Sequence, residues 1–178
     1  MELTKKNIKK YFSKLSDQLK LQNSKGEILL FGGAAMILTF NSRISTKDVD
    51  AVFKPKKEFQ IAIDHVAKDN NLNKNWLNDA VKGFLYSNKF NQKEILKFDN
   101  LTVYVPEPEY LLAMKVISMR TEAVSSDFED IKTLLKETGL DTPGKVLDLV
   151  REYYPENMIP QKSFYALEGI ISEAFNNN

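Results

Sequence analysis

The chain has 178 residues, and its 25 lysines and arginines nearly balance its 24 aspartates and glutamates, for a net charge of +1. This length suits one domain, or a small core with a helical extension. A net charge this small does not by itself indicate nucleic-acid binding, but it does not exclude a local basic patch. There is no cysteine and one histidine, His65, which excludes disulfides, thiolate metal sites and a multi-histidine zinc site. Any metal would be held mainly by oxygen.

Membrane and export signals are missing from the sequence. No run of eighteen apolar residues predicts a membrane helix, and the first residues lack the apolar stretch of a signal peptide. The lack of cysteine also fits a reducing compartment. We therefore expect a cytoplasmic protein with no membrane partner.

The first half of the chain alternates between helical and strand patterns. Apolar residues at helical spacing among lysines predict an amphipathic helix over residues 3–22, followed by a turn that ends at Gly26. Apolar runs bounded by glycine or proline predict short buried strands and helices. The elements expected next are a strand over 27–31, a buried helix over 33–40, a polar loop over 41–47, a strand over 48–53 and a helix over 56–69.

The second half is mainly helical. After an asparagine-rich loop, residues 76–86 have a pattern compatible with a helix, and residues 94–105 predict a hairpin that turns at Asp99 and Asn100. Further helices are expected over 107–121, over 126–137 with Ser125 or Ser126 as its cap, from Pro143, and from Pro160. The fold class expected is α/β, more loosely α+β: a small mixed sheet with packed helices and a C-terminal helical bundle.

Two short motifs carry the most chemical information. Gly32 and Gly33 end the apolar run 28–31, and Asp48 and Asp50 follow fifteen residues after Gly33. Glycines let backbone approach a ligand closely, and amides at a helix start attract phosphate. Two residues apart on a strand, both aspartates would point to one face. Neighbouring carboxylates repel each other unless a cation lies between them, and Mg²⁺ also binds substrate phosphates. The residues therefore predict a metal-nucleotide site.

Simpler interpretations of these motifs stay open. The glycine pair is also typical of a tight strand-to-helix turn, and polar-apolar-polar spacing is common on a strand with one solvated face. Aspartate is a poor strand former, so two on one face favour a functional reason. Arg43 and Thr46, between the motifs, either belong to an ordinary polar loop or contact a triphosphate.

Gly-Gly, a helix and then Asp-x-Asp on a strand resembles the signature of the nucleotidyltransferase superfamily of the DNA polymerase beta type. A second block has Lys115 and Arg120 on an apolar helix, followed by Asp127-x-x-Asp130. This block resembles small prokaryotic nucleotidyltransferases related to the type IV abortive-infection toxins, in which the same residue types occur in the same order. The resemblance covers roughly residues 27–137. It implies a nucleotidyltransferase core with an N-terminal helix over 1–106, and a helical part over 107–178 that closes the cleft.

The resemblance also implies an activity: transfer of an NMP from an NTP to an acceptor, which is RNA, a protein or a small molecule. Asp48 and Asp50 would hold Mg²⁺ or Mn²⁺, and Asp127 would activate the acceptor hydroxyl or position Lys115. The residues expected at the nucleotide are Gly32, Gly33, Arg43, Thr46 and Lys115. A toxin role with a separate antitoxin partner is implied by the same resemblance alone.

One departure from the family pattern matters. Enzymes of this type usually have a third carboxylate on a later strand, and Glu94 and Asp99 are the only acids in the predicted hairpin. Asp99 suits the turn, so Asp79 or Asp127 would have to substitute, or the third acid is missing.

Three functional hypotheses therefore remain. The first is the active enzyme. The second is a catalytically inactive nucleotidyltransferase fold that binds or regulates, and the third is a helical interaction protein in which the motifs are coincidental. Two simpler interpretations of the helical block stay open. In one, Lys115 only extends to solvent. In the other, Arg120, Asp127 and Asp130 form a structural ion-pair network.

Overall fold

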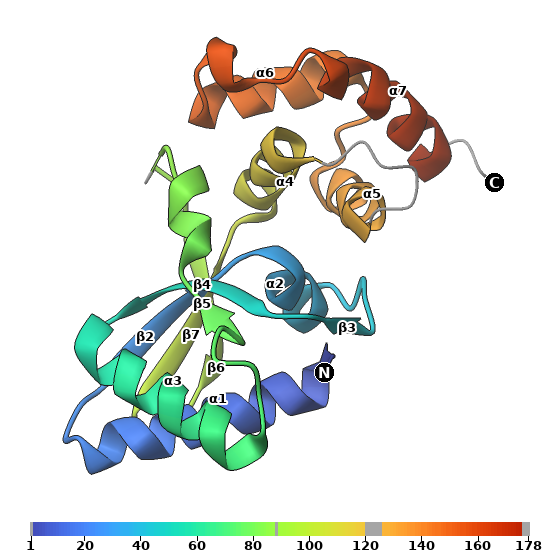
Figure 1. Ribbon diagram of the computed structural model, residues 1–178. Helices are drawn as coiled ribbons and strands as arrows, with labels where there is room; N and C mark the ends of the chain where they lie inside the picture. Colours follow the sequence, from blue (N-terminus) through green and yellow to red (C-terminus); the bar gives the residue numbers. More distant parts are fainter. Residues whose placement is uncertain (1, 88, 120–125, 176–178) are drawn as a thin grey trace. The chain divides into compact units, whose positions relative to one another are not determined.

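The computed structural model describes residues 2–87, 89–119 and 126–175 (Figure 1). It forms two compact units. The first unit contains Met1–Gly83 and Gln92–Pro106, and the second contains Phe84–Asn91 and Glu107–Asn178.

A five-stranded mixed sheet forms the centre of the first unit, in the order β5-β4-β2-β7-β6. Antiparallel pairing joins β2 to β4 and β6 to β7, whereas β2 and β7, and β4 and β5, run parallel. The strands are β2 (Gly26–Leu30), β4 (Val49–Lys54), β5 (Leu77–Asn78), β6 (Gln92–Lys97) and β7 (Leu101–Pro106). The expected α/β class with a small mixed sheet is confirmed.

The two faces of this sheet differ in burial. Along β2, β4 and β7, buried residues alternate with half-exposed ones, as period-2 side-chain alternation requires. The buried face packs against α1 (Lys5–Leu21) and α3 (Lys56–Asn70), which lie side by side in Figure 1. Asp50 belongs to the opposite set on β4 and is only half-buried. We call this second surface the open face.

Two short strands tie the N-terminus to the loop before β4. β1 (Leu3–Thr4) pairs antiparallel with β3 (Ser45–Thr46), with Leu3 opposite Thr46. Thr4 also caps α1, because its hydroxyl accepts a hydrogen bond from the amide of Asn7. The start of α1 and the loop that carries Thr46 are therefore held together.

The second unit is helical. Its helices are α4 (Pro108–Ser118), α5 (Ser126–Thr138), α6 (Pro143–Tyr153) and α7 (Lys162–Phe175), with a 3-10 turn η2 (Glu156–Met158). α4 packs against α5 and α6, and α7 packs against α5 and α6. Hydrogen bonds tie Phe84–Asn91 to these helices: the Tyr154 hydroxyl donates to the Phe84 carbonyl (2.9 Å), and the Tyr110 hydroxyl to that of Ser87 (3.0 Å).

Most of the predicted elements are confirmed, with informative differences. Residues 76–86 do not form one helix: β5 is followed by the 3-10 helix η1 (Ala80–Phe84). The amide of Val49 donates to the carbonyl of Trp76 (2.7 Å), and this pairing with β4 outweighs local helical preference. The strand predicted over 48–53 begins one residue later, and β1 and β3 were not predicted. The expectations for Arg120, Ser125 and the last three residues lie outside the described residues.

Among the described residues, no helix combines the length and apolarity needed to cross a membrane.

Candidate active site

The glycine turn lies directly against Asp50. At the end of β2, the Phe31 amide donates to the Asp50 carbonyl (2.9 Å), which fixes the turn beside β4. Gly32 has a positive φ of 55°, and a Cβ on it would lie 2.7 Å from Asp50 Oδ2. An L residue at this position would be strained and would also displace the carboxylate. Glycine is therefore required both by the backbone and by the approach of Asp50.

The second glycine lies against two other predicted residues. A Cβ on Gly33 would be 2.6 Å from Thr46 Oγ1 and 3.1 Å from Arg43 Nη1. The pairing of β1 with β3 holds Thr46 in place. The structure thus brings Gly32, Gly33, Arg43 and Thr46 together, with Asp50 beside them.

This turn also begins a helix. α2 (Gly32–Thr39) has Phe31 as its N-cap residue, and no side chain forms a capping hydrogen bond there. The first amides of any α-helix have no carbonyl of that helix to bind, and with the helix dipole they favour an anion. An anion bound here would meet helix amides with the Arg43 guanidinium and the Asp50 carboxylate close to the same turn. A phosphate accompanied by a cation satisfies both.

Asp48 precedes this site in the chain. It occupies a bend just before β4, two residues from Asp50, and is half-buried. Carboxylate oxygens suit Mg²⁺ or Mn²⁺, and Mg²⁺ is commonly held by one or two carboxylates together with substrate phosphates. Within the described ranges, no three His, Cys, Asp or Glu side chains gather as a metal-ligand set. Asp48 and Asp50 supply carboxylate oxygens, the donor type that suits such a metal.

The strand next to Asp50 carries an amide side chain at the position opposite it. On β5, Asn78 is the register partner of Asp50. The following residue, Asp79, accepts from Lys82 at 2.7 Å and forms an ion pair with Lys56 at 3.4 Å. The hydrogen bond from Lys82 is the main cause that lowers the pKa of Asp79. Asp79 thus already has two lysine partners.

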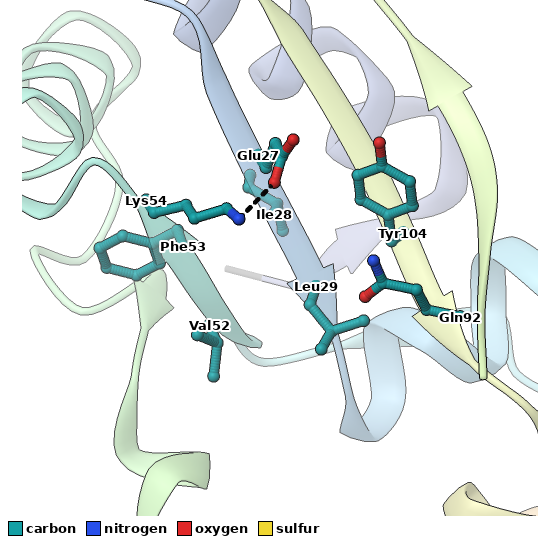
Figure 2. A pocket seen from close by; sticks show the side chains of 8 residues that line it. All are labelled: Glu27, Ile28, Leu29, Val52, Phe53, Lys54, Gln92 and Tyr104. Atoms are coloured by element: carbon teal, nitrogen blue, oxygen red, sulfur yellow. Dashed lines mark ion pairs between the residues drawn. The ribbon is translucent and has the colours of Figure 1, made fainter. Parts of the chain in front are cut away.

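A hollow of about 170 Å³ opens on the same face of the sheet as Asp50 (Figure 2). One wall is the ion pair between Lys54 and Glu27 (2.9 Å), and the hydrogen bond to Glu27 raises the pKa of Lys54. The hollow is lined by Glu27, Ile28, Leu29, Val52, Phe53, Lys54, Gln92 and Tyr104. The hollow leaves no signal in the sequence, because its lining residues come from four strands whose order only the fold shows.

In the second unit, Lys115 is the centre of a charged cluster. Its ammonium lies 2.7 Å from Asp127 Oδ1 and 2.7 Å from Asp130 Oδ2. The Lys115 side chain is 12% exposed and that of Asp130 is 0% exposed, so Lys115 does not simply extend into solvent. We refer to these three residues as the Lys115 cluster. It joins α4 to α5, and the expected pairing of Lys115 with Asp127 is present.

A family model described as "Nucleotidyltransferase of unknown function (DUF6036)" matches residues 6–153. The chain belongs to this family. The family name gives an activity class without a substrate. The matched span contains both the glycine turn with Asp50 and the Lys115 cluster.

One solved structure with a similar fold is the crystal structure of an antigenic nucleotidyltransferase-like protein from Paracoccidioides brasiliensis. The TM-score is 0.50 at 16% sequence identity, and the match covers 99% of this chain and 100% of that one. At this identity the similarity shows the nucleotidyltransferase-like fold alone. None of the curated proteins matches the chain.

Proposed function

We propose that this member of the nucleotidyltransferase family transfers an NMP from an NTP to a hydroxyl of an acceptor, with Mg²⁺ or Mn²⁺ as the metal. The observation that carries the proposal is the Gly32–Gly33 turn, packed against the Asp50 carboxylate on one side and against Arg43 and Thr46 on the other. This arrangement offers donors for phosphate next to acceptors for a cation.

In the proposed reaction, the acceptor oxygen forms a bond to the α-phosphorus, and the bond from that phosphorus to the bridging oxygen breaks. Pyrophosphate leaves with the bonding electron pair, and the hydroxyl proton passes to a base. The turn amides and Arg43 would hold the phosphates, and Asp48 and Asp50 would hold the metal. Such a metal would supply neutralisation of the charge that develops on the phosphate oxygens. Lys115 and Asp127 enter the proposal through the family resemblance, and their 2.7 Å ion pair favours Asp127 as a positioning residue for Lys115.

A catalytically inactive member of the family is the second candidate. It is favoured by Asn78, which takes the register position beside Asp50, and by the two lysine partners of Asp79. An inactive protein would still bind nucleotide, so turnover separates the two candidates. Support for a toxin role, for an antitoxin partner and for a cytoplasmic location comes from the sequence alone.

The deciding experiment incubates the protein with each α-labelled NTP, Mg²⁺ and either total cellular RNA or total protein. We expect label in a product with the wild type and none with the double variant Asp48→Asn plus Asp50→Asn. The double variant should melt no earlier than wild type without metal, because removing two neighbouring negative charges relieves repulsion. Metal-dependent NTP binding without turnover would support the inactive candidate. Equal nucleotide affinity in wild type and double variant would refute the site.

A further inference from the structure

Charge is distributed very unevenly between the two units. The first unit contains seventeen lysines and arginines and eleven aspartates and glutamates, a net charge of +6. The second contains eight and thirteen, a net charge of −5. The near-zero total of the chain therefore conceals a basic unit, and that unit carries the glycine turn and Asp50.

The positive charge is concentrated at the start of α1. This helix has six lysines and one aspartate, and its first turn has no acid. Five of these lysines form what we call the α1 lysine face: Lys5, Lys6, Lys9, Lys10 and Lys14. Lys6, Lys9 and Lys10 are exposed, and in the part of the chain that the structure describes they have no acidic partner. Lys5 and Lys14 donate to the asparagine side chains of Asn41 and Asn70.

This arrangement does not benefit the helix itself. Lys5 and Lys9, Lys6 and Lys10, and Lys10 and Lys14 are like-charged neighbours four residues apart, which destabilise a helix. Cations near a helix N-terminus also oppose the helix dipole, which favours acids there. A sequence that breaks two local rules at one exposed place indicates a functional use.

The α1 lysine face is connected to the candidate active site. β1, immediately before α1, pairs with β3 and places Thr4 opposite Ser45 and Leu3 opposite Thr46. Thr46 in turn lies against Gly33, since a Cβ there would be 2.6 Å from its hydroxyl. The lysines thus begin directly after β1, which pairs with the strand that carries Thr46.

We propose that the α1 lysine face binds the sugar-phosphate backbone of a nucleic-acid strand, which is the acceptor of the proposed transfer. This inference rests on the proposed function for the role of the strand, but the binding itself does not. Lysines without base-reading or aromatic side chains contact phosphates and give affinity without sequence specificity. A terminal hydroxyl of the bound strand then has access to the nucleotide.

Other polyanionic partners fit less well. The exposed side of α1 also carries Ser13 and Asp17 and lacks aromatic anchors, whereas protein interfaces are poor in lysine and rely on aromatic and other buried anchors. A membrane-surface helix needs a free apolar face, but the apolar face of α1 is buried: Ile8, Phe12 and Leu15 are each 0% exposed. The exposed lysines of the α1 lysine face fit the phosphates of a nucleic acid better than either of these partners.

The test measures binding by fluorescence anisotropy of the full chain to labelled single-stranded RNA and DNA of about 16 nucleotides, long enough for a large single-strand site. Salt is varied from about 50 to 200 mM, without NTP and with EDTA. The variant is Lys6→Gln, Lys9→Gln and Lys10→Gln together. Its matched control is Lys57→Gln, Lys68→Gln and Lys74→Gln, which removes the same charge from exposed positions of the same unit.

We expect salt-dependent binding by the wild type. Each phosphate contact to a single strand contributes about 0.7 to the log-log salt slope, so the three α1 substitutions should reduce the slope by about 2 and weaken binding roughly 100-fold at about 0.1 M salt. The control should change affinity by less than about 3-fold, because Lys57, Lys68 and Lys74 lie outside the α1 lysine face. A triple Lys→Arg variant at positions 6, 9 and 10 should bind as wild type, which separates lost charge from lost folding.

Equal weakening in the variant and its control, or no salt-dependent binding of either strand, would overturn the inference. Equally tight binding to polyglutamate would also overturn it, in favour of an acidic protein. Comparison of RNA with DNA identifies which strand is preferred. The Asp48→Asn plus Asp50→Asn variant should retain strand binding, so a failure of the proposed transfer and a failure of strand binding are distinguishable.

Discussion

Replacing Lys115 by methionine removes the positive charge of the Lys115 cluster at nearly constant length. Two carboxylates then remain without their common partner, and one of them, on Asp130, is 0% exposed. Removing one partner of a buried ion pair costs about 3–5 kcal/mol, because the remaining charge stays out of water. Asp127 is 21% exposed and keeps some access to solvent, so we expect a loss of about 3 kcal/mol in the free energy of unfolding.

Lys132 offers a matched control on α5. Its ammonium also pairs with two carboxylates, Glu129 at 2.6 Å and Glu173 at 2.9 Å, but these are 66% and 60% exposed. Exposed pairs contribute about 0–1 kcal/mol, so Lys132→Met should cost less than about 1 kcal/mol. The two variants have the same change of residue and differ in the burial of the partners.

Urea unfolding followed by circular dichroism at helical wavelengths measures both variants. Tryptophan fluorescence is unsuitable, since the single tryptophan, Trp76, belongs to the first unit. For a chain of 150–250 residues, about 3 kcal/mol corresponds to a fall of roughly 6–12 °C in Tm. If Lys115→Met and Lys132→Met lose the same stability, the reasoning from buried charge is wrong and the cluster is an ordinary surface network.

Gly32→Ala should lower the free energy of unfolding by about 1–2 kcal/mol, because it places a methyl group against Asp50 at a positive φ. Calorimetry should also show loss of metal-NTP binding by this variant. Intact binding would contradict the phosphate role of the turn. Tyr104→Ala removes an aromatic ring from the hollow of the open face and should raise KM for either the NTP or the acceptor by about 5- to 150-fold, the range of one base stacking on an aromatic ring. Unchanged KM for both substrates would exclude the hollow as a substrate site. Burial raises the pKa of Tyr154 above its ordinary value of about 10. The stability that the buried, neutral Tyr154 hydroxyl contributes is therefore complete below about pH 10 and is lost as the pH rises above it. Thermal melts from about pH 9 to 11 should therefore fall less steeply in Tyr154→Phe than in wild type, and parallel curves would refute this assignment.

Local chemistry in the sequence determined most of the elements and the centre of the site. Apolar runs bounded by glycine or proline identified β2 and β4, and a hairpin pattern identified β6 and β7. Pro143 identified the start of α6 because its fixed φ suits a first helical position. Gly32 was recognised because glycine at the end of a buried strand lets the backbone approach a ligand closely, and the structure adds that its φ is 55°. These signals depend on a few neighbouring residues, so they can be read without a fold.

Tertiary structure decided which distant residues meet. Arg43 and Thr46 lie against Gly33 because β1 pairs with β3 across some forty residues, and two-residue strands leave almost no pattern in a sequence. Strand pairing likewise placed Asn78 beside Asp50 and assembled the hollow from four strands. Whether Lys115 is paired or solvated depended on the packing of α4 against α5, which buries Asp130. Contacts of this kind depend on burial and register, which a linear sequence specifies only through the whole fold.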